Sequence, residues 1–188
     1  YLHLPVQSGS DRVLKAMNRG HTAEHYIRLI EKIRAARPDI ALSGDMIVGF
    51  PGETDEDFNG LVDFVEKQKF EWAGVFTYFQ KDGTPAANLP NQVPEEVKLE
   101  RQRLLMETQA RISSSKLDAM IGNVFPVLID GPSGEHEWVV GGRMETQAPG
   151  VDGLVYLDAP PEDLVPGEIR KVRIERTSDY DLVGAVFA

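Results

Sequence analysis

The segment that decides the fold is Ile47-Val48-Gly49-Phe50-Pro51-Gly52-Glu53-Thr54, in which an apolar run ends in a glycine-rich turn and a carboxylate. Residues 40–46 continue the apolar run upstream and predict that it is a β-strand. Downstream, Thr54 and Asp57 have the spacing of a capping box, and apolar residues then recur with helical periodicity. The segment therefore predicts a strand, a loop and a helix, with the loop at the carboxyl end of the strand, where α/β barrels build active sites.

The first 121 residues repeat this alternation of strand and helix. The expected strands are residues 1–6, 40–48 and 72–79, and the expected helices are two that begin after Ser10 and Thr22, one at 55–69 and a long one at 94–121. This order favours parallel βαβ units. Because three strands are too few to close an eight-stranded barrel, we expect a partial (half) TIM-like parallel βα barrel or an open sheet.

Beyond Gly122 the helical period disappears, and short β-rich runs alternate with turn residues. These runs are residues 124–129, 138–142, 153–157, 169–174 and 182–187. Five short strands in a segment of this length predict a small antiparallel β-barrel. The expected domains are therefore residues 1–121 and residues 122–188.

The composition excludes several classes of protein. No apolar run approaches the roughly 20 residues of a membrane-spanning helix, and the chain begins without a secretory signal, so we expect a soluble, cytoplasmic protein with no membrane partner. The chain has no cysteine, which excludes disulfides and any zinc or iron-sulfur site held by thiolates of these residues. Because the chain opens at Tyr1 within an apolar stretch, we interpret it as a fragment of a longer protein.

Charge is distributed unevenly between the two expected domains. Residues 1–121 contain 15 Lys and Arg against 18 Asp and Glu, whereas residues 122–188 contain 5 against 12, so that the net charges are −3 and −7. Binding to nucleic acid depends on cations that neutralise phosphates. An acidic second domain is better suited to a basic protein partner.

The loop from Gly49 to Glu53 has two interpretations, a ligand site or a tight turn whose glycines satisfy the backbone geometry. Glu53 by itself could be a carboxylate that interacts with the dipole of the following helix. Residues 7–10 (Gln-Ser-Gly-Ser) occupy the corresponding place one βα unit earlier. Gln7 and Ser8 offer amide and hydroxyl groups that suit ribose or carboxylate oxygens.

The histidines give no metal signal. His3 could face the interior of the barrel or be a satisfied core residue, and the other three histidines have no paired spacing typical of metal ligands. We therefore predict no metal ligand in this chain, and no residue stands out as catalytic.

Taken together, four motifs in this order resemble the radical S-adenosylmethionine methylthiotransferases. The motifs are residues 3–10 (HLPVQSGS), 47–54 (IVGFPGET), 83–87 (GTPAA) and 93–98 (VPEEVK). The resemblance covers the whole chain and implies the C-terminal half of a radical SAM partial barrel, followed by a small β-barrel called the TRAM domain, which binds substrate. The cysteines that hold the cluster would lie upstream of Tyr1, in the missing N-terminal part of the same protein.

The resemblance also implies cofactors and residues that bind them. Such enzymes use S-adenosylmethionine and two 4Fe-4S clusters to install a methylthio group on an unactivated carbon, and the ligands of both clusters would lie outside this chain. Carried over by position, Gln7 and Ser8 are expected near the ribose or methionine part of S-adenosylmethionine. Ile47 and Gly49 are expected beside the adenine, with Glu53 in the same set. Without the cluster cysteines, the fragment alone is expected to be inactive.

The substrate implied by the resemblance differs between the two domains. Residues 3–10 are similar to the branch that modifies adenosine in tRNA, since the branch that modifies an aspartate of a small-subunit ribosomal protein more often has Asp in place of His3 and His in place of Ser8. Residues 148–153 and 179–184 are similar to the ribosomal-protein branch. The net charge of −7 favours a ribosomal protein as partner, while tRNA methylthiolation and a non-catalytic binding module remain alternatives.

Overall fold

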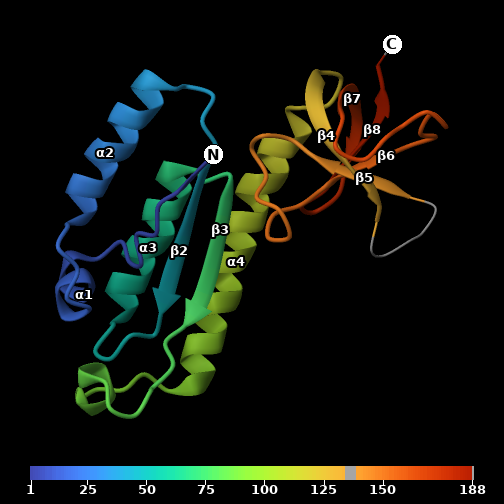
Figure 1. Ribbon diagram of the computed structural model, residues 1–188. Helices are drawn as coiled ribbons and strands as arrows, with labels where there is room; N and C mark the ends of the chain where they lie inside the picture. Colours follow the sequence, from blue (N-terminus) through green and yellow to red (C-terminus); the bar gives the residue numbers. More distant parts are fainter. Residues whose placement is uncertain (134–138, 188) are drawn as a thin grey trace. The chain divides into compact units, whose positions relative to one another are not determined.

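The computed structural model of the chain describes residues 1–133 and 139–187 (Figure 1). The contacts divide it into two compact units, one formed by Leu2–Ile112 and the other by Ser113–Ala188 together with Tyr1. We call the first the α/β unit and the second the barrel unit. No helix in the described ranges has both the length and the apolar character needed to cross a bilayer.

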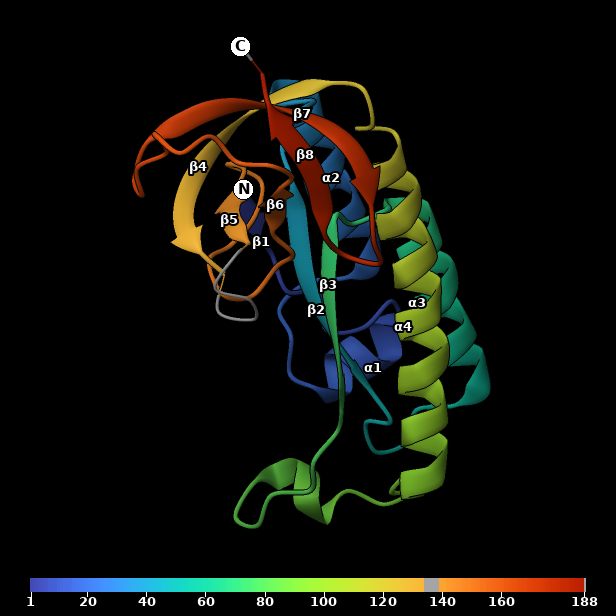
Figure 2. The ribbon, with the colours of Figure 1, turned by 90° about the vertical axis from the view of Figure 1, so that its right-hand side faces the viewer.

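The α/β unit contains a three-stranded parallel sheet in the order β1-β2-β3, which confirms the partial-barrel prediction. Its elements are β1 (Leu2–His3), α1 (Asp11–Ala16), α2 (Ala23–Ala36), β2 (Leu42–Val48), α3 (Asp55–Gln68), β3 (Trp72–Thr77), η1 (Pro85–Asn88) and α4 (Glu95–Asp118). Figure 2 shows α3 and α4 on the same side of the sheet. The hydrophobic core lies between the sheet and the helices, and side chains from β2, α2, α3 and α4 contribute to it.

Local capping signals explain where the helices begin. Ser10, Thr22 and Thr54 are the N-caps of α1, α2 and α3, and each side chain accepts a hydrogen bond from a backbone N–H of its helix. The predicted capping box of Thr54 and Asp57 is confirmed, with both reciprocal hydrogen bonds present.

The first strand is shorter than predicted. β1 ends at His3, the backbone N–H of Leu4 still donates to the Ser43 carbonyl at 2.7 Å, and Gln7 then forms an isolated parallel bridge with Met46. Pro5 lies in the interruption between Leu4 and Gln7. The expected strand at 1–6 therefore forms as two separate contacts with β2.

The buried face of α4 is more polar than its apolar residues suggested. Leu104 is 38% exposed, whereas Lys98, Arg101 and Gln109 are buried. The periodicity of apolar residues could not identify this face, because the buried residues include cations and amides. These polar groups can be buried because they have polar partners elsewhere in the α/β unit. The Gln109 side chain, for example, donates a hydrogen bond to the Phe70 carbonyl at 3.0 Å.

The barrel unit is a closed five-stranded barrel in the order β4-β5-β6-β8-β7, which confirms the second predicted fold. The strands are β4 (Val124–Pro132), β5 (Val140–Arg143), β6 (Val155–Leu157), β7 (Ile169–Thr177) and β8 (Leu182–Val186). The expected start of the second strand, Trp138, lies outside the described residues. One feature differs from an all-antiparallel barrel, because β6 and β8 pair in parallel.

Candidate ligand site at the strand ends

The loops that follow β1 and β2 meet at the carboxyl edge of the sheet. The Gln7 amide donates to the Asp45 carbonyl, and the Ile47 amide donates to the Gln7 carbonyl, both at 2.9 Å. The structure thus brings together two of the predicted segments. In open α/β sheets, ligands bind in crevices outside the carboxyl ends of the strands.

Gln7 adopts a backbone conformation that non-glycine residues seldom use. Its φ angle is +75°, and the residue is only 7% exposed. Such strained residues persist only where their surroundings enforce them, and they cluster at ligand sites. The next residue, Ser8, is buried, and its hydroxyl accepts a hydrogen bond from the Ser10 amide at 3.2 Å, so Ser8 also shapes the turn.

Ile47 lies on the face of the sheet that points away from the core. Met46 and Val48 on either side of it are fully buried, whereas Ile47 is only half-buried. In the register of the parallel sheet, Ile47 pairs with Phe76 of β3, which is 54% exposed. An accessible apolar pair therefore lies beside the polar backbone at Gln7, a combination that suits an aromatic base attached to a polar sugar.

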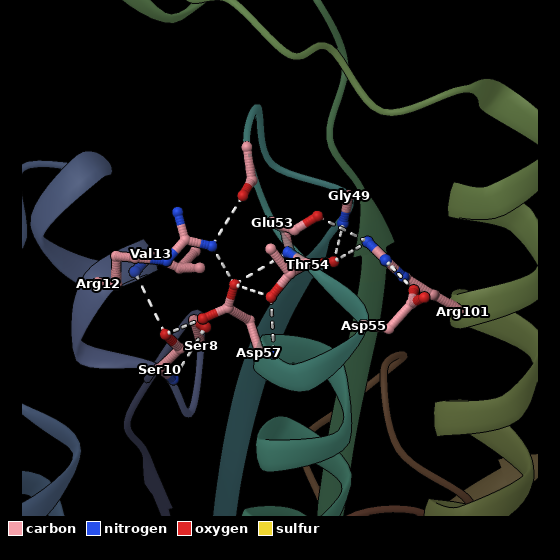
Figure 3. A network of polar contacts seen from close by, with 11 residues as sticks. Ser8, Ser10, Arg12, Val13, Gly49, Glu53, Thr54, Asp55, Asp57 and Arg101 are labelled. Atoms are coloured by element: carbon pink, nitrogen blue, oxygen red, sulfur yellow. Dashed lines mark hydrogen bonds and ion pairs between the residues drawn. The ribbon is translucent and has the colours of Figure 1, made fainter.

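Glu53 is turned back into the loop, as Figure 3 shows. Its carboxylate oxygen Oε1 accepts hydrogen bonds from the Gly49 amide at 2.8 Å and from Nη1 of Arg101 at 2.7 Å. Arg101 also donates to Asp55 at 2.7 Å. The Glu53 side chain is 1% exposed, and its carboxylate holds the loop in this conformation. Because the carboxylate is bound by Gly49 and Arg101, the helix-dipole interpretation is left without support.

The pKa of Glu53 reflects these opposing influences. Burial raises the pKa above the ordinary value of a glutamate, while the hydrogen bond from Gly49 and the charge of Arg101 oppose the rise. The arrangement is a buried ion pair whose two members also have further hydrogen-bond partners.

Gly49 is required by two features of the loop. Its φ angle is +74°, and a Cβ atom at this position would lie 2.3 Å from Cγ of Lys98. Of the two interpretations of the loop, a ligand site or a tight turn, neither anticipates that the close approach at Gly49 is made by a side chain of α4. The ammonium group of Lys98 lies 5.6 Å from the centre of the Tyr78 ring, and that ring makes an edge contact with Phe50.

Asp57 ties the loop after β1 to the start of α3 (Figure 3). Its carboxylate accepts hydrogen bonds from the Ser10 hydroxyl at 2.6 Å, from the amide and hydroxyl of Thr54, and from Arg12. Although burial raises it, these hydrogen bonds hold the pKa of Asp57 well below its usual range. Arg12 also donates to the Gly52 carbonyl at 2.7 Å, so the two loops are held in one arrangement.

Several residues around this site were not expected from the sequence. Lys98 and Arg101 stand three positions apart in α4, and this spacing places them on one face of the helix together with Leu105. That shared spacing was the signal in the sequence that could have identified them as buried. His3 also has partners, since its ring contacts the Ser43 hydroxyl at 3.0 Å and the Asp45 carboxylate at 3.3 Å. Within the described ranges, no group of three or more His, Cys, Asp or Glu residues is arranged to hold a metal ion.

Comparisons with known proteins agree with this architecture. Residues 1–65 match the radical SAM superfamily, and residues 121–187 match the TRAM domain. The chain is 45% identical over its whole length to ribosomal protein uS12 methylthiotransferase RimO of Geobacter sulfurreducens, and 47% identical over 99% of its length to that of Geotalea uraniireducens. It is also 45% identical, over 99% of its length, to tRNA-2-methylthio-N(6)-dimethylallyladenosine synthase of Maricaulis maris.

The chain spans about two fifths of the length of these relatives, covering 42%, 41% and 39% of them respectively. It corresponds to their C-terminal part. With a radical SAM match in the α/β unit, a TRAM match in the barrel unit and this identity over the whole chain, the chain belongs to the radical S-adenosylmethionine methylthiotransferase family.

Proposed function

We propose that the carboxyl edge of the sheet binds S-adenosylmethionine in the intact protein. Gln7 and Ser8 would line the ribose or methionine part, and Ile47 and Gly49 would lie beside the adenine. The accessible apolar pair of Ile47 and Phe76, next to the strained backbone of Gln7, supports this placement. Glu53 would contribute indirectly, by holding the Gly49 amide in place.

The iron-sulfur clusters that serve this family need ligands from outside this chain. The chain contains no cysteine, and thiolates are the usual ligands of 4Fe-4S clusters. When bound, a reduced cluster supplies the electron that cleaves S-adenosylmethionine. The residues present here would orient the nucleoside and exclude water from it.

The barrel unit supports a basic protein as substrate. Residues 122–188 contain 5 Lys and Arg against 12 Asp and Glu. The arginines already have partners: Arg143 pairs with Asp130, Arg170 with Asp163 and Glu168, and Arg176 with Asp158, while Arg173 lies over the ring of Phe187. Since three of the five cations are in ion pairs, a phosphate backbone would find few free positive charges, whereas a basic partner would meet an excess of carboxylates.

We therefore infer that the intact protein adds a methylthio group to an aspartate of a small-subunit ribosomal protein in the cytoplasm. Residues 1–121 would provide half of the partial barrel, and residues 122–188 would bind the substrate. The acidic barrel carries this choice of substrate, and the relatives named as uS12 methylthiotransferases support it. Methylthiolation of tRNA adenosine is the second candidate, favoured by residues 3–10 and by the relative in Maricaulis maris.

The test offers both substrates to the intact protein after reconstitution with iron and sulfide. Mass spectrometry should find a methylthio group on an aspartate of the ribosomal protein in the presence of S-adenosylmethionine and a reductant. Reversing the charge of Glu162 in the barrel to Lys should weaken binding of the ribosomal protein, whereas Glu31→Lys on the exposed face of α2 serves as the matched control. Modification of tRNA alone would overturn the choice of substrate, and the absence of any product would overturn the reaction.

A further inference from the structure

The first turns of α4 pack against the loop that follows β2. Lys98 lies against Gly49, and Arg101 binds Glu53, so two cations one helical turn apart contact opposite ends of the same five-residue loop. Both side chains are buried, at 9% and 7% exposure. α4 is thus part of the strand-end site, although it starts about 40 residues later in the chain.

The contacts of Arg101 define one position for its guanidinium. Nη1 donates to Oε1 of Glu53 at 2.7 Å, and more weakly to the Glu53 carbonyl at 3.4 Å, while Nη2 donates to Asp55 at 2.7 Å. The carbon at the centre of the guanidinium lies 5.5 Å from the centre of the Phe58 ring. A planar fork with two carboxylate partners is more selective in direction than a lysine ammonium would be.

These contacts form a chain that ends at the proposed nucleoside site. Arg101 fixes the carboxylate of Glu53, the carboxylate accepts from the Gly49 amide, and that amide belongs to the peptide at the carboxyl end of β2. Burying an ion pair costs desolvation, and an apolar contact of similar volume often stabilises a fold equally well. What the ion pair adds is a defined orientation of one backbone amide beside Ile47.

We propose that Arg101 is a positioning residue for S-adenosylmethionine: by locking Glu53 it sets the shape of the Gly49 to Glu53 loop before the nucleoside binds. This role rests on the proposed function and extends it to α4, which lies outside residues 1–65 that match the radical SAM superfamily. Supporting side chains of this kind hold binding groups within the small tolerance that tight binding requires.

The test uses the intact reconstituted protein and three variants, Arg101→Met, Arg101→Lys and the control Arg103→Met. Arg103 is on the same helix, with a half-exposed side chain that pairs with Glu100 and Glu107. The Kd of the unreactive analogue S-adenosylhomocysteine, measured by calorimetry, should rise roughly 10- to 100-fold in Arg101→Met, because the loop loses its preset geometry. Arg101→Lys should give a smaller rise, and Arg103→Met should match the wild type.

Two further measurements separate positioning from simple loss of folding. Hydrogen exchange at the Gly49 amide should accelerate in both Arg101 variants while the strand amides of β2 stay protected, and KM for S-adenosylmethionine should rise more than kcat falls. If Arg101→Met does not fold, the same measurements on Arg101→Lys decide whether Arg101 is a positioning residue. Variants that fold and bind the analogue as the wild type does would overturn the positioning role, whereas a wild-type protein that binds no S-adenosyl compound would overturn the proposed function itself.

Discussion

An ion pair at the strand-end site of the α/β unit and an ion pair at the surface of the barrel unit lie in opposite environments. In the α/β unit, the side chains of Arg101 and Glu53 are 7% and 1% exposed. In the barrel unit, the paired Arg176 and Asp158 are 65% and 51% exposed. The desolvation cost of a buried pair is offset only by good geometry and further hydrogen bonds. An exposed pair contributes little to stability and mainly adjusts surface charge. The difference indicates that the first unit fixes the shape of a site and the second sets the electrostatic character of a surface.

The largest expected effect comes from breaking the buried pair. Arg101→Met leaves the Glu53 carboxylate buried without its cation, and this should lower the free energy of unfolding by about 3–5 kcal/mol. Urea denaturation followed by helical circular dichroism would report the loss, since α1 to α4 supply that signal. Arg103→Met, which removes a half-exposed partner on the same helix, should leave the midpoint within error. Equal effects from the two substitutions would contradict the distinction between buried and exposed pairs.

Gly49→Ala should have the next largest effect. The substitution places a side chain on a residue with φ of +74° and forces Lys98 to move. Gly52→Ala in the same loop is a matched control, because its φ is +81° but the nearest atom to an added Cβ is 3.8 Å away. We expect losses of about 2–3 kcal/mol and about 1 kcal/mol respectively, measured by urea denaturation. In a Lys98→Ala background the two losses should become similar, and a persistent difference would show that Lys98 is not the cause.

Asp57→Asn should produce a smaller loss that depends on pH. Removing the carboxylate of the capping box should cost about 1–2 kcal/mol at neutral pH. The folded-state pKa of Asp57 is depressed, so its contribution is complete above the unfolded pKa of about 3.9 and is lost as the pH falls toward the folded pKa. The stability difference between wild type and variant should therefore shrink below about pH 4. Asp63→Asn on the exposed face of α3 is the control, and a difference for Asp57→Asn that grew on acidification would have the wrong sign.

The smallest effect is expected at the surface of the barrel unit. Arg176→Ala removes the exposed partner of Asp158, and the midpoint of thermal unfolding should stay within experimental error. The same substitution makes the barrel more acidic, so binding of a basic ribosomal protein at low salt should not weaken. A loss of stability comparable to that of Arg101→Met would remove the contrast between the two units.

Local signals made much of the fold predictable from the sequence. Ser10, Thr22 and Thr54 mark helix starts, because their side chains form hydrogen bonds within the first turn. Such capping residues can be recognised in a short stretch of sequence. The parallel pairing of β6 with β8 was missed, because strand order depends on contacts between distant segments. Runs of apolar and turn residues predict how many strands there are, and they carry little information on which strands become neighbours.

The candidate site was predictable only in part, for the same reason. The resemblance implied roles for Gln7, Ile47 and Gly49, and the structure places these residues at the carboxyl ends of neighbouring strands. Their contact with a ligand stays a prediction. Arg101 was missed although it contacts Glu53 directly, since the two residues are 48 positions apart and periodicity scores only apolar residues. The buried polar residues of α4 therefore became visible only when the helix was seen packed against the loop.

The polar face of α4 also has a consequence for how the chain folds. Apolar helix faces tolerate small sliding movements, because one leucine can replace another in a hydrophobic contact. Gln102, which donates to the Val75 carbonyl at 2.7 Å, and Arg101 allow no such exchange. A displacement of α4 by one turn would leave a guanidinium and an amide in the interior without acceptors. The helix is thus restricted to a single axial register during folding, with misregistered intermediates penalised by their unpaired polar groups.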